Sequence, residues 1–218
     1  MIKGVIFDLD GVLVSTDELH FKAWKQLADE IGVTGFSRED NIRQRGVSRM
    51  ASLEVVLEKS DKNYTQEEKE ELAERKNNYY KEMLKSLDDG ACLPGALKTL
   101  DYLKNSNVST AVGSASKNAI PILESTGLMP LIDKVSCGLD VTKSKPDPEV
   151  FLVAAEKLGL PANECLVVED SKAGIEAAKK GGMKSLGVGA DFEQLGADYM
   201  ARDLSMVNDS MWKNIIEA

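Results

Sequence analysis

A short apolar run followed at once by two closely spaced acidic residues is the feature that most constrains this chain. Residues 5–7 (Val-Ile-Phe) form the run, and the sequence continues Asp8-Leu-Asp10-Gly11. The run is typical of a buried β-strand, and because side chains of an extended backbone alternate between faces, Asp8 and Asp10 should project the same way. Carboxylates this close repel each other unless a cation intervenes. The pair indicates a metal or catalytic centre, and the alternative is a strand that ends in two solvated aspartates before a turn at Gly11.

The composition restricts the class of protein. The chain has 218 residues, of which 43% are hydrophobic, so it can bury a sizeable core. Its three cysteines (Cys92, Cys137 and Cys165) are far apart and form no C-x-x-C pair, which predicts neither a disulfide framework nor a zinc site. No signal-peptide pattern or membrane-length apolar run is present, and the net charge of −9 disfavours a nucleic-acid surface. We expect a soluble, monomeric protein of the cytoplasm without nucleic-acid or membrane partners.

The part of the chain after the first strand is predicted to be all helical. Apolar residues recur at helical spacing between residues 20 and 31, and Ser48 is placed to cap a second helix. Thr65 and Glu68 match a capping box that opens a long charged helix. Residues 38–45 are polar and are predicted to be a connection. We therefore expect residues 15–92 to form a helical insertion.

The remainder alternates short strands with helices. Strands are predicted at residues 108–113, 134–137, 165–169 and 185–188, with helices near 95–104, 118–127, 148–158 and 172–180. Such alternation predicts a parallel sheet with helices on both faces. The expected fold is α/β, with a Rossmann-like core made of residues 1–14 and 93–218 and an inserted α-helical cap domain made of residues 15–92.

Polar residues follow the predicted strands, where ligands bind in open parallel sheets. They supply carboxylates for a hard cation, hydroxyl and amide groups for phosphate, and a lysine to balance its charge. The set is Asp8 and Asp10, then Ser114 to Asn118 (Ser-Ala-Ser-Lys-Asn), then Lys145, then Glu169 and Asp170.

At this point the chain resembles the haloacid dehalogenase superfamily of phosphotransferases. Four motifs of that superfamily stand in order: FDLDGV, Ser114, Lys145 and EDS at residues 169–171. Further signatures resemble the β-phosphoglucomutase branch, namely HFKAW at 20–24, GVSR at 46–49, RKN at 75–77, SASKN at 114–118 and SKP at 144–146. Arg45 stands where that branch usually has a lysine, which keeps the charge but changes the donor geometry.

The resemblance implies a role for each core residue. Asp8 would be the nucleophile that forms an aspartyl phosphate, and Asp10 the general acid and base. Ser114 and Lys145 would hold the transferring phosphoryl group. The implied cofactor is Mg²⁺, held by Asp8, the backbone carbonyl of Asp10, Asp170 and, directly or through water, Glu169.

The resemblance also implies substrate contacts. Arg49 would bind the non-transferring phosphate of a sugar phosphate, although a lone helix arginine is usually solvated. His20 would couple the cap and the substrate to Asp10, against the alternative of a packed histidine. The other expected substrate-binding residues are Trp24, Arg45, Gly46, Val47, Ser48, Lys76, Ala115, Ser116, Lys117 and Asn118. For Ser116 a helix cap is the alternative, and for Trp24 packing.

The resemblance therefore implies a Mg²⁺-dependent mutase that interconverts β-glucose 1-phosphate and glucose 6-phosphate through a bound bisphosphate. A mutase must keep water from its aspartyl phosphate, and a mobile cap would supply that exclusion. Two alternatives remain open: a sugar-phosphate phosphatase with the same core, and a noncatalytic sugar-phosphate sensor.

Overall fold

The computed structural model describes residues 1–44 and 47–218, which form two units of different architecture. One unit comprises Met1–Ser15 and Asp88–Ala218, and the other comprises Thr16–Leu87. We call them the α/β unit and the helical unit. No helix in the described ranges is long and apolar enough to cross a membrane.

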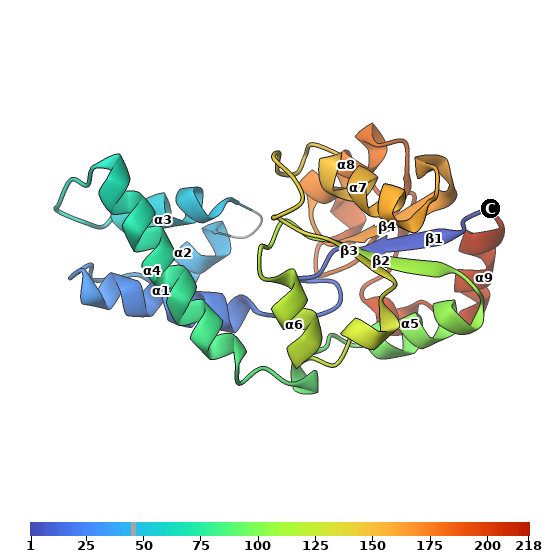
Figure 1. Ribbon diagram of the computed structural model, residues 1–218, viewed down its shortest axis with the longest axis horizontal. Helices are drawn as coiled ribbons and strands as arrows, with labels where there is room; N and C mark the ends of the chain where they lie inside the picture. The colour runs from blue at the N-terminus through green and yellow to red at the C-terminus, as the bar shows by residue number, and fades with distance from the viewer. Residues whose placement is uncertain (45–46) are drawn as a thin grey trace. The chain divides into compact units, whose positions relative to one another are not determined.

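The α/β unit is built on a six-stranded parallel sheet with the strand order β3-β2-β1-β4-β5-β6 (Figure 1). The strands are β1 (Gly4–Phe7), β2 (Ser109–Gly113), β3 (Lys134–Ser136), β4 (Cys165–Glu169), β5 (Lys184–Gly187) and β6 (Tyr199–Met200). The first strand therefore lies in the middle of the sheet, between β2 and β4. The predicted fold class is confirmed: a Rossmann-like parallel sheet with helices on both faces, together with an inserted helical unit.

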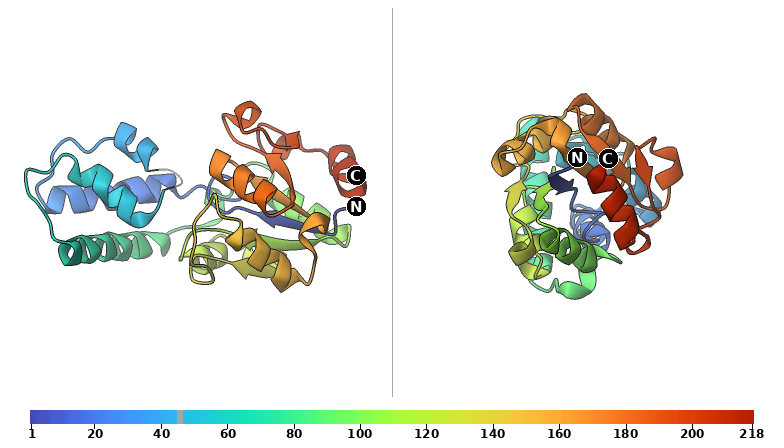
Figure 2. Two further views of the ribbon diagram at one scale, coloured as in Figure 1. Left: turned by 90° about the horizontal axis from the view of Figure 1, so that it is seen from above. Right: turned by 90° about the vertical axis from the view of Figure 1, so that its right-hand side faces the viewer.

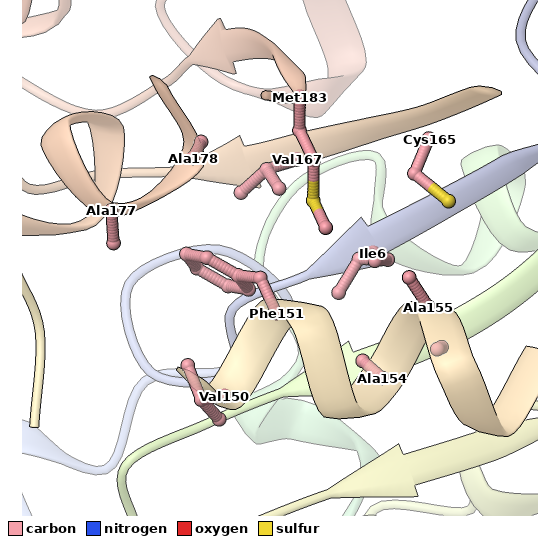
Figure 3. Packing of buried hydrophobic residues seen from close by; sticks show 11 residues of the cluster. Ile6, Val150, Phe151, Ala154, Ala155, Cys165, Val167, Ala177, Ala178 and Met183 are labelled. Carbon is pink, nitrogen blue, oxygen red and sulfur yellow. The ribbon is translucent and has the colours of Figure 1, made fainter. Parts of the chain in front are cut away.

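Helices cover both faces of the sheet, because the central strands β1, β2 and β4 are buried over nearly their whole length. The helices are α5 (Ala96–Asn105), α6 (Ala119–Ser125), α7 (Glu149–Leu158), α8 (Lys172–Lys180) and α9 (Asp209–Glu217). Figure 1 shows α7 and α8 on one face and α5 on the other. Ile6 and Val167 pack with Phe151 of α7 and with alanines of α8 in one buried cluster (Figure 3). All four residues of β1 are buried, as expected for a strand covered on both faces.

The two ends of the chain lie side by side in the α/β unit (Figure 2). The backbone N–H of Ile2 donates to the carbonyl of Ile216 in α9 at 2.8 Å. The last helix is thereby attached beside the start of β1. Neither β6 nor α9 is among the predicted elements.

The helical unit contains four α-helices in its described residues and has its own apolar core. They are α1 (Asp17–Glu30), α2 (Arg38–Arg43), α3 (Arg49–Leu57) and α4 (Gln66–Leu84). Trp24, Leu27, Leu53 and Leu72 are buried in one cluster that joins α1, α3 and α4. The predicted capping box of α4 is present, since Thr65 and Glu68 each bond the backbone N–H of the other.

The prediction for residues 38–45 was wrong over most of its length. Arg38–Arg43 form α2, which begins with a capping box between Ser37 and Asp40. The segment has one strongly apolar residue, Ile42, whose side chain is exposed. It therefore lacks the apolar periodicity by which amphipathic helices are detected.

Candidate active site

The candidate nucleophile, Asp8, lies directly after the central strand of the sheet. Its backbone N–H donates to the carbonyl of Val168 in β4 at 2.9 Å, and the residue is 8% exposed. Phe7 is paired in register with Val112 of β2 and with Val168 of β4. Residues that follow β2 and β4 are therefore brought to the same edge of the sheet as Asp8.

Lys145 joins two acidic residues of this edge. Its ammonium group is 2.5 Å from Asp8 Oδ1 and 2.7 Å from Glu169 Oε2. The same ammonium lies 4.6 Å from the centre of the buried Phe151 ring. Burial alone would lower the pKa of Lys145, but the carboxylates of Asp8 and Glu169 raise it above its ordinary value. Lys145 is therefore a fixed positive charge beside Asp8.

Glu169 is held by the start of the next helix. Its Oε1 accepts hydrogen bonds from the backbone N–H groups of Asp170 and Ser171 at 3.1 Å each and from the Ser171 hydroxyl at 2.9 Å. Burial acts to raise the pKa of Glu169, but the Lys145 charge and these donors bring it below its ordinary value. A Cβ on Gly174 would lie 2.0 Å from the Glu169 carboxylate, so only glycine leaves room for it.

Asp170 occupies space that another glycine provides. Gly11 has a φ of +87°, and a Cβ there would lie 2.0 Å from Asp170 Oδ2. Burial, and secondarily the charge of Glu169, raise the pKa of Asp170 to about 7. Burial likewise raises the pKa of Asp8 well above its ordinary value, although Lys145 opposes the rise.

Three carboxylates of the described residues come close enough to share one cation. Oxygens of Asp8, Glu169 and Asp170 lie within 4.8 Å of one another. Burial and the neighbouring carboxylates raise the pKa values of Asp8 and Asp170, and a bound cation would oppose this rise. The donor set consists of oxygens alone, which suits a hard divalent ion. The residues therefore fit a metal site, and the carboxylate of Asp10, partly buried two residues beyond Asp8, is outside this group.

The loop after β2 presents the serines that were predicted to bind phosphate. Ser114 is buried, and its hydroxyl accepts from the backbone N–H of Ser116 at 3.1 Å. The Ser116 hydroxyl in turn accepts from the N–H of Asn118 at 3.2 Å. Asn118 is the N-cap of α6, while Ala115 and Lys117 are exposed. The loop is thus fixed by its own hydroxyl groups.

In the helical unit, His20 and Lys76 form one contact. Lys76 Nζ lies 2.7 Å from His20 Nδ1, and since an ammonium can only donate, the ring proton belongs on Nε2. Burial lowers the pKa of His20 well below its ordinary value, and the charges of Lys76 and Arg49 lower it further. The ring stacks on Tyr80, with centroids 4.1 Å apart. His20 is therefore a neutral histidine with a donor at Nε2.

The other predicted residues of the helical unit have distinct surroundings. Trp24 is buried in the apolar cluster, with Lys76 Nζ 4.6 Å from its ring centre. Val47 is 45% exposed, and the Ser48 hydroxyl caps α3 by accepting from Ala51. Arg49 is the first residue of α3 and pairs with Glu74 at 3.1 Å. Arg45 and Gly46 lie outside the described residues.

Comparison with known proteins identifies the family. The model of the haloacid dehalogenase-like hydrolase family matches residues 5–188. The chain belongs to this family. Its predicted resemblance to that superfamily is thereby confirmed.

Relatives within the haloacid dehalogenase-like hydrolases include mutases and phosphatases. The β-phosphoglucomutase of Bacillus subtilis is 40% identical over 206 residues, which is 94% of this chain and 91% of that protein. The phosphorylated carbohydrates phosphatase of Thermotoga maritima is 30% identical, over 85% of this chain and 84% of that protein. The crystal structure of β-phosphoglucomutase from Clostridium difficile matches with a TM-score of 0.89 and 34% identity, over 100% of this chain and 98% of the other.

Some contacts of the site were not predicted from the sequence. The motifs supplied Asp8, Lys145 and Glu169, but not the ion pairs that join them or the ring of Phe151 beneath the ammonium. Gly11 was predicted as a turn residue, and its second role, leaving space for Asp170, depends on a contact between residues 159 positions apart. Glu74, the partner of Arg49, had no signal because it is one of many acidic residues on α4.

Proposed function

We propose that this chain catalyses the interconversion of β-D-glucose 1-phosphate and D-glucose 6-phosphate through an aspartyl phosphate and a glucose 1,6-bisphosphate intermediate. The observation that carries the proposal is the buried carboxylate of Asp8, fixed by Lys145 next to Glu169 and Asp170. The 40% identity to a β-phosphoglucomutase over most of both chains supports the choice of substrate.

The first half of the reaction places a phosphoryl group on the sugar. Starting from the enzyme with phosphorylated Asp8, the 6-hydroxyl of glucose 1-phosphate attacks phosphorus while Asp10 takes the hydroxyl proton. The bond between phosphorus and the Asp8 oxygen breaks, which gives the bisphosphate and a free Asp8 carboxylate.

The second half restores the phosphorylated enzyme. After the bisphosphate is bound with its other end toward the core, Asp8 attacks the phosphorus of the 1-phosphate. The bond to the sugar oxygen O1 breaks, and Asp10 returns its proton to that oxygen. The product is glucose 6-phosphate, and Lys145, a fixed cation, stabilises the negative charge on the transferring oxygens.

We propose Mg²⁺ as the cation of the acidic group, because a donor set made of oxygens alone suits it. Asp8, Asp170, the backbone carbonyl of Asp10 and, directly or through water, Glu169 would hold it. When bound, it would neutralise the carboxylates and the phosphoryl oxygens.

We assign substrate binding to the loop after β2 and to the helical unit. Ser114, Ser116 and Asn118 would contact phosphate or sugar, and Arg49 the non-transferring phosphate. The guanidinium of Arg49 suits a phosphate because it offers paired donors. In this proposal, the small-molecule partner is a sugar phosphate and the site of action is the cytoplasm.

A product assay tests the function. The enzyme is incubated with β-glucose 1-phosphate, Mg²⁺ and a bisphosphate primer, and glucose 6-phosphate is measured against free phosphate. We expect mainly glucose 6-phosphate, and Asp8→Asn should abolish it because an amide is not a nucleophile toward phosphorus. Mostly free phosphate would instead support a sugar-phosphate phosphatase, the activity named for the Thermotoga relative.

A further inference from the structure

The arginine assigned to the non-transferring phosphate is paired with a carboxylate. Arg49 Nη1 lies 3.1 Å from Glu74 Oε2, and the side chains are 31% and 55% exposed. Glu74 lies within α4, which packs against α3 in the helical unit. Among the described residues, Glu74 is the one acid within ion-pair distance of Arg49.

The Glu74 carboxylate is oriented by its own helix. Its Oε1 accepts from the side-chain amide of the buried Asn77 at 3.3 Å and lies 3.7 Å from Lys81 Nζ. Asn77 and Lys81 follow Glu74 by three and seven residues, which places all three on one face of the helix. These contacts use one oxygen and leave the other for Arg49.

Arg49 belongs to a positively charged part of the helical unit. Lys76 contacts His20, and the charges of Lys76 and Arg49 both act on the partly buried His20 ring. Positive charge of this kind attracts a phosphate. Glu74 Oε2 already offers the Arg49 guanidinium a negatively charged oxygen, as a phosphate would.

We propose that Glu74 is a competing counter-ion for Arg49, which weakens the binding of the non-transferring phosphate and so limits the affinity for phosphorylated sugars. This proposal rests on the proposed function, because it requires Arg49 to bind that phosphate. A substrate must displace Glu74 or share Arg49 with it. Glu74 thereby raises KM and prevents the bisphosphate intermediate and the product from being held too tightly.

The test is the steady-state kinetics of Glu74→Gln with β-glucose 1-phosphate and a saturating bisphosphate primer. The change keeps the shape of the side chain and removes its charge. We expect KM to fall about two- to fivefold, the factor that corresponds to an exposed ion pair, while kcat stays the same or falls. An unchanged or higher KM would overturn the proposal.

Glu71→Gln is the matched control. Glu71 is an exposed acid on the same helix, and its ion pair is with Arg75. The control removes the same charge from α4 without touching Arg49, so KM should stay at the wild-type value. An equal fall of KM in both variants would mean a general charge effect and would also overturn the proposal.

Two further measurements separate this proposal from the proposed function. Acetyl phosphate carries no second phosphate, so its KM as a phosphoryl donor should be the same for wild type and Glu74→Gln. In an Arg49→Ala background, Glu74→Gln should have no further effect. If Arg49→Ala itself leaves KM for the sugar phosphate unchanged, the role of Arg49 in the proposed function fails. If Arg49→Ala raises this KM but Glu74→Gln does not lower it, only the proposal for Glu74 fails.

Discussion

Two glycines make room for the acidic side chains of the core. A Cβ on Gly174 would overlap Glu169, and one on Gly11 would overlap Asp170. The motif residues were predicted from the sequence because their types and order are distinctive. The role of Gly11 and Gly174 in making room for these side chains was not predicted, because a close approach of residues far apart in the chain leaves no local pattern.

Gly11→Ala should disable the proposed metal site. The new methyl group would displace Asp170, and alanine is also strained at a φ of +87°. We expect loss of Mg²⁺ binding, measured by calorimetry, and a fall in unfolding free energy of about 1–3 kcal/mol. Gly127→Ala is the control, because Gly127 has a φ of +71° with no atom within 4 Å. It should show the backbone strain and keep metal binding; equal Mg²⁺ binding in both variants would contradict the steric role of Gly11.

The pKa of Asp170 predicts a pH dependence for metal binding. The carboxyl must lose its proton to bind a cation, and its pKa is raised from 3.8 to about 7 by burial and by Glu169. The apparent Mg²⁺ affinity should therefore fall at least about tenfold for each pH unit below about 7. Titration calorimetry measures the slope over a range of about pH 5.5 to 8, which brackets that pKa. A flat affinity over this range would contradict the prediction.

The raised pKa of Asp170 also makes the stability of the metal-free protein depend on pH. Since the folded pKa of Asp170 is raised, the folded state keeps a proton that the unfolded state loses above pH 3.8. This contribution to stability is fully present below that pH and is lost as the pH rises through about 7. Asp170→Asn has no such proton. The unfolding free energy of the wild type, relative to that of the variant, should therefore fall as the pH rises from 3.8 to about 7.

At the scale of helices and strands, the apolar patterns predicted the elements that pack against a core. β1, β2, β4 and the helices α5, α7 and α8 were predicted within one or two residues, since each is buried on at least one face. The short helix α2 was missed because Ile42 is its one strongly apolar residue and is exposed. The helix α9 has a usable signal, Asn208 as its cap followed by the buried Trp212 and Ile215, which the prediction did not use.

The capping box of α4 should contribute measurably to the helical unit. Thr65 Oγ1 accepts from the N–H of Glu68, and Glu68 accepts from the N–H of Thr65. Thr65→Ala removes the first bond and should lower the unfolding free energy by about 1 kcal/mol. Urea unfolding followed by Trp24 fluorescence in a Trp212→Phe background measures the loss. Gln66→Ala, on the exposed side of the same turn, is the control and should change stability by less; an equal loss would contradict the capping role.

At the scale of the whole molecule, the chain divides into two units that each bury a separate apolar core. The sequence predicts a helical insertion at residues 15–92, because strand patterns are absent from that part and alternate with helices outside it. The acidic group that fits a metal lies wholly in the α/β unit. Ligand binding to one unit stabilises that unit by mass action, so the two cores should respond differently to Mg²⁺.

The two tryptophans allow this difference to be measured, since Trp24 is buried in the helical unit and Trp212 in the α/β unit. In Trp24→Phe the fluorescence reports the α/β unit, and in Trp212→Phe it reports the helical unit. Mg²⁺ at a hundredfold excess over its Kd should increase the unfolding free energy of the α/β unit by about 2.7 kcal/mol. The urea midpoint of Trp24→Phe should therefore rise. The midpoint of Trp212→Phe should not move, because no proposed metal ligand lies in the unit that it reports. Equal shifts in both variants would mean that the two units unfold together, whereas a shift confined to Trp212→Phe would contradict the assignment of the metal site to the α/β unit.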